Sequence, residues 1–225
     1  MGIQWCWARV HIFRLGGLDF PPGSNSGPNN SEFDNKESNI TLWVFEHPLF
    51  AACGVGRIYC NDPADQPFAT DASKFALFSA AVAKAIVSNC FGAVDVLHLH
   101  DWHAAMVSVL AAYDPDYKAL LSIHTVYTIH NLSLQGLRPL DGDKSSLHAW
   151  FPDLTYDTEL IADPRDSHCI NPMRAGINLC DKVHAVSPNY AREILLPSNH
   201  EQGYFGGEGL EDDLRRADDE GRLYG

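Results

Sequence analysis

The chain has 225 residues, of which 45% are hydrophobic and 20% charged, so it can build a folded core and is neither disordered nor fibrous. It carries 16 Lys+Arg against 29 Asp+Glu, a formal net charge of −13. This balance argues against a nucleic-acid or anionic-membrane partner, which would need a basic patch, but not against a sugar ligand.

The sequence carries no targeting signal that we recognise. No apolar run approaches membrane-spanning length, and the start, "MGIQWCWARVHIF", lacks a basic region and a small-residue cleavage site. The cysteines form no C-x-x-C pair; they are Cys6, Cys53, Cys60, Cys90, Cys169 and Cys180. We expect most of them to be buried or inert thiols in a soluble, cytoplasmic protein.

The first 40 residues are expected to be irregular or poorly ordered, because residues 20–39 are rich in Pro, Gly, Ser and Asn. The rest, 41–225, is expected to form one domain. Two runs rich in β-branched and aromatic residues, 40–45 ("ITLWVF") and 54–60 ("GVGRIYC"), predict strands.

A helix is then predicted after Asp71, which we expect to be its N-cap, with an apolar stripe at spacings of three and four. Residues 93–99 ("AVDVLHL") predict a short strand, followed by a helix from about Trp102. Residues 119–130 ("ALLSIHTVYTIH") predict another strand.

Two later helices have clear start signals, Asn171-Pro172 and Ser187-Pro188, each a capping side chain before a proline. A strand is predicted between them at 182–187 ("KVHAVS"). A last helix is predicted near "EGLEDDLRRA", with its acidic residues first and its arginines later.

Strands that alternate with helices predict an α/β fold, a Rossmann-like parallel sheet with helices on both faces. Ligands of such sheets bind at the carboxyl ends of the strands. Three junctions are therefore of interest: residues 98–103, 130–135 and 187–190.

The first junction, "HLHDWH", contains His98, His100, Asp101 and His103. A metal site is one interpretation, but the metallohydrolase pattern H-x-H-x-D-H places its aspartate one residue later. A purely structural interpretation makes Asp101 the N-cap of the next helix and His98 a core histidine.

A third interpretation is a sugar site. His130 and Asn131 end the next strand, and parallel strands with polar ends can meet in one crevice. His, Asn, Asp and Gln side chains hydrogen-bond to hydroxyl-rich ligands, and Trp102 could offer an apolar ring face. The residues alone leave these three interpretations open.

Four blocks resemble bacterial glycogen (starch) synthases: "DVLHLHDWHAA", "TIHNLSLQG", "RAGINLCDKVHAVSPNYAREI" and "GGEGLEDDL". The resemblance implies the N-terminal half of a GT-B glycosyltransferase, a metal-independent enzyme without a cofactor. It would transfer glucose from ADP-glucose to the non-reducing end of an α-1,4-glucan with retention. Its partners would be ADP-glucose, the glucan and a C-terminal GT-B domain, with no nucleic acid and no membrane.

The resemblance also assigns residues. By motif, His130 and Asp101 would be catalytic, and Asn131, Gln135, Gly136 and His103 would bind substrate. His98, His100 and His124 would be structural. A non-catalytic glucan-binding module is the alternative function, and a metallohydrolase a more distant one.

Two departures from the family lead us to expect a fragment that is inactive, or nearly so, alone. The family's first strand-turn-helix unit carries K-T-G-G-L, whereas the nearest string here is Arg14-Leu15-Gly16-Gly17-Leu18. The C-terminal domain, with its Arg/Lys pair and acidic motif, is also missing from this sequence.

Overall fold

The computed structural model describes residues 9–15 and 40–225, with side chains from residue 41 on. The chain forms two compact units, Cys6–Pro48 and a larger one over Leu49–Gly225. The prediction for Gly16-Gly17-Leu18 lies outside the described residues.

The smaller unit contains two antiparallel strands, β1 (Arg9–Leu15) and β2 (Ile40–Glu46). Arg9 lies opposite Glu46, and Leu15 opposite Ile40. The strand predicted at 40–45 is confirmed. The irregular segment predicted over 1–40 differs from the structure at Arg9–Leu15, which form a strand. A 3₁₀ turn, η1 (Pro48–Ala51), follows β2.

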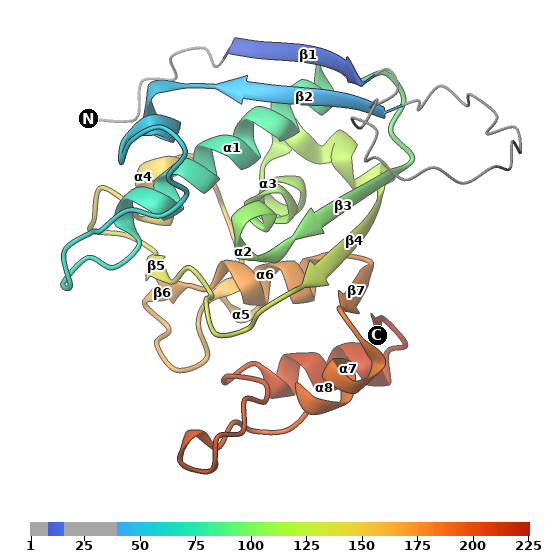
Figure 1. The fold of residues 1–225 in the computed structure, drawn as a ribbon. Coiled ribbons are helices and arrows are strands. Elements are labelled where there is room, and N and C mark those ends of the chain that lie inside the picture. Colours follow the sequence, from blue (N-terminus) through green and yellow to red (C-terminus); the bar gives the residue numbers. More distant parts are fainter. Residues whose placement is uncertain (1–8, 16–39) are drawn as a thin grey trace, which may run out of the picture. The chain divides into compact units, whose positions relative to one another are not determined.

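The larger unit is built on a four-stranded parallel sheet in the order β3-β4-β7-β8 (Figure 1). Its strands are β3 (Val96–His100), β4 (His124–Ile129), β7 (Lys182–Ala185) and β8 (Leu223–Tyr224). A two-residue antiparallel pair, β5 (Arg138–Pro139) with β6 (Cys169–Ile170), lies apart from this sheet. The parallel α/β class predicted from the alternating pattern is confirmed.

Helices connect and flank these strands. The α-helices are α1 (Ala69–Val87), α2 (Asp101–Ala104), α3 (Met106–Tyr113), α4 (Leu147–Trp150), α5 (Thr158–Ile161), α6 (Pro172–Leu179), α7 (Pro188–Glu193) and α8 (Glu211–Asp219). The 3₁₀ segments in this unit are η2 (Pro115–Ser122) and η3 (His200–Gln202).

The two Pro-preceded helix starts are confirmed. Asn171 Oδ1 accepts a hydrogen bond from Arg174 N at 3.0 Å, and Ser187 Oγ accepts one from Tyr190 N at 3.1 Å. Each cap satisfies an amide that has no partner within the first helical turn.

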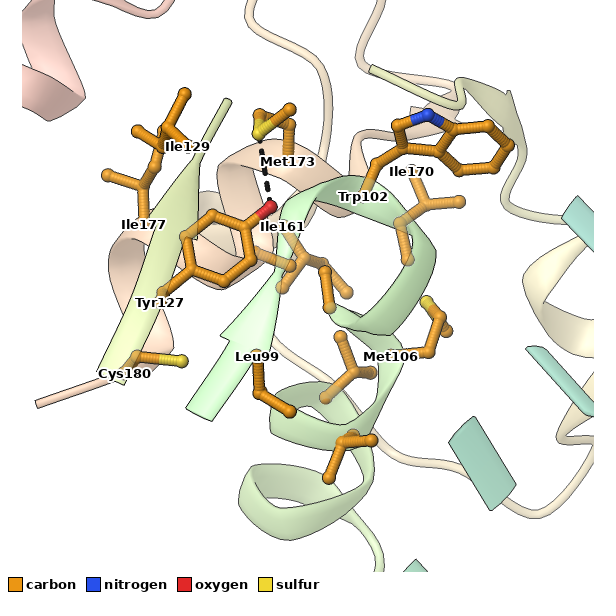
Figure 2. Close-up of a cluster of buried hydrophobic side chains, with 14 of the residues drawn as sticks. Leu99, Trp102, Met106, Tyr127, Ile129, Ile161, Ile170, Met173, Ile177 and Cys180 are labelled. Carbon is orange, nitrogen blue, oxygen red and sulfur yellow. Dashed lines mark hydrogen bonds between the residues drawn. The ribbon is translucent and has the colours of Figure 1, made fainter. Parts of the chain in front are cut away.

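One face of the sheet is buried in the core (Figure 2). Side chains alternate along a strand, so Leu99, Tyr127 and Val183 share this face and are at most 3% exposed. Tyr127 crosses to α6, where its hydroxyl donates to Met173 Sδ at 3.0 Å. A Cβ at Gly176 would lie 2.3 Å from the Tyr127 ring, so this helix needs glycine there.

The strand predicted at 54–60 is wrong. This segment is a series of turns, and Gly54 and Gly56 have φ of 106° and 80°, which a regular strand does not allow. A disulfide joins Cys53 to Cys60, with the Cα atoms 5.4 Å apart. These two cysteines are therefore not among the inert thiols that the sequence led us to expect for most of the six. Cys90, Cys169 and Cys180 are free.

Asp71 is not the N-cap of α1, which begins two residues earlier with Phe68 at the N-cap. Asp71 lies inside the first turn and is fully buried. Its carboxylate accepts hydrogen bonds from Cys60 N at 3.1 Å and forms an ion pair with Lys74 Nζ at 2.8 Å. The local capping rule failed because this carboxylate has partners in a neighbouring loop.

Within residues 9–15 and 40–225, no helix is long and apolar enough to cross a membrane.

Candidate functional site at the ends of β3 and β4

Asp101 connects the carboxyl ends of two neighbouring strands. It follows β3 directly, while His130 and Asn131 follow β4. Asp101 Oδ1 accepts hydrogen bonds from His130 N at 2.7 Å and from Asn131 N at 3.4 Å. The structure thus brings together three of the predicted site residues.

The purely structural interpretation, in which Asp101 is the N-cap of the next helix, is wrong. The N-cap of α2 is His100, which makes no side-chain cap bond. Asp101 itself has a left-handed backbone, with φ of 52°. Asp tolerates this region better than most residues, and such strain is concentrated at functional sites. Its carboxylate holds the loop after β4 instead of the start of its own helix.

His130 also contacts His100 through its side chain. His130 Nε2 lies 3.0 Å from His100 Nδ1, and both side chains are exposed. Asn131 is exposed as well, and its Oδ1 accepts from Ser133 N at 2.8 Å, which fixes the first turn of the loop. Exposed imidazole and amide groups therefore lie at the sheet edge where parallel α/β folds bind ligands.

Gln135 is buried, and its amide is fully engaged within the protein. Its Nε2 donates to Leu132 O at 3.0 Å and Glu208 O at 3.1 Å. Its Oε1 accepts from Asn171 Nδ2 at 2.6 Å and Arg165 Nη2 at 3.2 Å. Gln135 therefore fixes the loop after β4 from its buried side. It does not belong to the exposed group that contains His130.

Gly136 is buried against Trp102. It has a φ of 72°, and a Cβ there would lie 2.1 Å from Trp102 Cε3. Trp102 is 2% exposed, so it offers no ring face to a ligand, contrary to the suggestion from the sequence. Both residues set how closely the loop after β4 approaches α2.

His103 lies in an aromatic cluster beside Trp102. Its ring stacks on Trp102 at 4.7 Å and meets the edge of Phe75 at 4.6 Å. Burial lowers the pKa of His103, against the opposing effects of Asp101 and Asp71. Its Nε2 lies 2.7 Å from the hydroxyl of Tyr59.

Comparison with known proteins matches residues 18–216 to the model of the starch synthase catalytic domain. The chain belongs to this family. It is 35% identical over 174 residues to a glycogen synthase of Gloeobacter violaceus, covering 76% of this chain and 31% of that protein. A glycogen synthase of Bacillus licheniformis is 39% identical over 132 residues, covering 56% of this chain and 25% of that one.

The fold of this starch synthase family member also resembles a solved structure. That structure is the catalytic domain of starch synthase IV from Arabidopsis thaliana, bound to ADP and acarbose. The TM-score is 0.61 at 21% identity, with 99% of this chain and 41% of that chain covered. The chain matches 31% and 25% of the lengths of the two curated relatives described above.

Sequence reasoning missed Tyr59 in this family member. Tyr59 was expected in a strand, but it lies in the turn closed by the disulfide and contacts His103 from 44 residues away. No local pattern signals this contact.

A metal site was one interpretation of the first junction, and its geometry can be described for residues 9–15 and 40–225. No group of three or more His, Cys, Asp and Glu side chains there is arranged to hold a metal ion.

Proposed function

We propose that the chain supplies the acceptor side of an ADP-glucose-dependent α-1,4-glucan glucosyltransferase that retains the configuration of the transferred glucose. The observation that carries the proposal is the group of Asp101, His130 and Asn131 at the carboxyl ends of β3 and β4. Family membership and the glycogen synthase relatives support the reaction class.

In this proposal His130 acts closest to the transferred glucose. Retaining transfer passes through an oxocarbenium-like state, so preorganised polar groups around the ring stabilise the developing charge. The exposed His130 imidazole can supply such a group, and Asn131 can bind a sugar hydroxyl. Asp101 holds the backbone of both residues, and we assign the sugar contact to its second oxygen, Oδ2.

We assign the remaining predicted residues a structural role that supports these three. The buried amide of Gln135 and the close approach at Gly136 fix the loop that carries His130 and Asn131. His103 stacks on Trp102 within α2 and holds Tyr59 against this helix. We propose no cofactor and no metal for the reaction.

The partners we propose are ADP-glucose, the non-reducing end of the glucan, and a second GT-B domain that carries most nucleotide contacts. We propose a cytoplasmic location for this chain. The redox state of Cys53 and Cys60 in freshly lysed cells tests this location directly. The structure joins them in a disulfide, and disulfides are rare in a reducing cytoplasm.

The first experiment measures ADP release from ADP-glucose and glycogen. We expect no release above background from the chain alone, and release when a separately expressed C-terminal domain of a relative is added. His130→Ala should abolish that release. His148→Ala is the matched control, because His148 is exposed in α4, outside the β3–β4 group.

The second experiment titrates the chain with maltoheptaose. Binding that depends on His130, together with ADP release after complementation, supports the transferase. Binding without ADP release in any combination would indicate a glucan-binding module, and no binding at all would overturn the acceptor role.

A further inference from the structure

The sheet face opposite the core carries a line of polar side chains across three strands. In the register of the sheet, His100 on β3 is paired with Thr128 on β4, and Thr128 with His184 on β7. His98 lies two residues before His100 and therefore on the same face. This line continues to His130, two residues after Thr128.

Thr128 is the centre of this line. It is only 3% exposed, and its Oγ1 lies 2.6 Å from His98 Nε2 and 3.2 Å from His184 Nδ1. A hydroxyl has one proton to donate, so at most one of these two imidazoles accepts from Thr128, and a ring that does not accept must donate to it. The tautomers of His98 and His184 are thereby set together.

His98 in turn supports His100. Their ring centroids are 4.3 Å apart, at an interplanar angle of 34°. The next contact is the 3.0 Å hydrogen bond between His100 Nδ1 and His130 Nε2. An unbroken series of contacts therefore runs from the buried hydroxyl of Thr128 to the exposed imidazole of His130.

We propose that Thr128, His98 and His184 form a hydrogen-bonded array that positions His100 and, through it, the imidazole of His130. The array consists of positioning residues, since none of the three is in the exposed group at the strand ends. The functional meaning of the array rests on the proposed glucosyltransferase role of His130.

The surroundings of His98 and His100 favour the neutral form of these two rings. Burial is the main cause that lowers the pKa of His98, followed by His184 and His130. Burial also lowers the pKa of His100, followed by His98 and His130, while Asp101 acts in the opposite direction. A neutral imidazole has one donor and one acceptor nitrogen, so a neutral His98 can donate to or accept from Thr128, and a neutral His100 can do either with His130.

The test compares Thr128→Val with Thr128→Ser. Valine keeps the branched shape and removes the hydroxyl, whereas serine keeps the hydroxyl. Long-range ¹H–¹⁵N NMR of the histidine rings reports the tautomer of each imidazole. We expect one dominant tautomer at His98 in the wild type and in Thr128→Ser, and a mixture in Thr128→Val.

The same spectra test the positioning step. The ring signals of His100 and His130 should move in Thr128→Val and stay in place in Thr128→Ser. If Thr128→Val unfolds, His184→Phe removes the second partner of the same hydroxyl at a half-exposed position. Unchanged His98 tautomers, or unchanged His130 signals in a folded variant, would overturn the array.

Adding maltoheptaose separates this inference from the proposed function. We expect Thr128→Val to weaken binding about fivefold, the effect of one ordinary hydrogen bond, with Thr128→Ser near the wild type. If the His130 signals of the wild-type protein do not shift when maltoheptaose is added, the proposed function is refuted. The His98 tautomers would still show whether the array exists. Full-strength binding by Thr128→Val would overturn the positioning role.

Discussion

Replacing Gly136 with alanine tests the packing behind the candidate site. Gly136 has a φ of +72°, and a Cβ there would lie 2.1, 2.6 and 2.7 Å from three carbons of the Trp102 ring. The ring cannot easily withdraw, because it is 2% exposed and packs edge-on to Phe75 at 5.0 Å and against His103 at 4.7 Å.

Two effects lower the free energy of unfolding in Gly136→Ala, and they add. A left-handed backbone costs an L-residue about 1–2 kcal/mol. Overpacking a filled core costs about 1–3 kcal/mol more. We therefore expect the free energy of unfolding to fall by about 2–5 kcal/mol, a large part of the total for an ordinary domain.

Two matched variants separate these costs in urea unfolding. Gly142→Ala has the same backbone requirement, with φ of +79°, but nothing within 4 Å of its Cβ. Gly176→Ala meets the Tyr127 ring at 2.3 Å, and its glycine is helical. Gly136→Ala should be the most destabilised of the three. A loss in Gly136→Ala no larger than in Gly142→Ala would refute the argument that Trp102 fills this space.

Three further predictions concern stability. Asn171→Ala should lower the free energy of unfolding by about 2–4 kcal/mol, and Ser187→Ala by about 0.5–2 kcal/mol. The difference arises because the buried Asn171 amide has partners beyond the cap. Urea unfolding of both variants measures it. Lys74→Met should cost about 3 kcal/mol by the same assay, since it leaves the buried Asp71 carboxylate without its ion-pair partner; a loss below that of an exposed Lys118→Met control would contradict this. The lowered pKa of His103 means that the unfolded chain binds a proton at higher pH than the folded one. Stability should therefore fall as pH drops below about 6.5 toward the folded pKa, and His103→Gln should flatten that slope between pH 7 and 5; an unchanged slope would contradict the assignment.

The parts of the fold set by local signals were predictable. Asn171-Pro172 and Ser187-Pro188 each combine a side chain that accepts an amide with a proline suited to the first helical turn, and both helices begin there. The strands β3, β4 and β7 followed from apolar runs, with boundaries shifted by a few residues.

The failures came from partners distant in sequence. Asp71 and Asp101 both fit the capping rule, but each carboxylate binds backbone amides of another segment, 11 and 29 residues away. The proximity of Asp101, His130 and Asn131 could be anticipated because polar residues follow the ends of two predicted strands, whereas their roles came from the family resemblance. The contact of Tyr59 with His103 depends on a turn that the sequence did not predict.

The buried amide of Gln135 joins the loop after β4 to three other segments, through Arg165, Asn171 and the carbonyl of Glu208. An amide has a donor end and an acceptor end, so each neighbour must present the matching group. A change at Gln135 would remove these hydrogen bonds at once unless its side-chain neighbours changed with it. We therefore expect positions 135, 165 and 171 to vary together in an alignment of relatives, as one inherited unit.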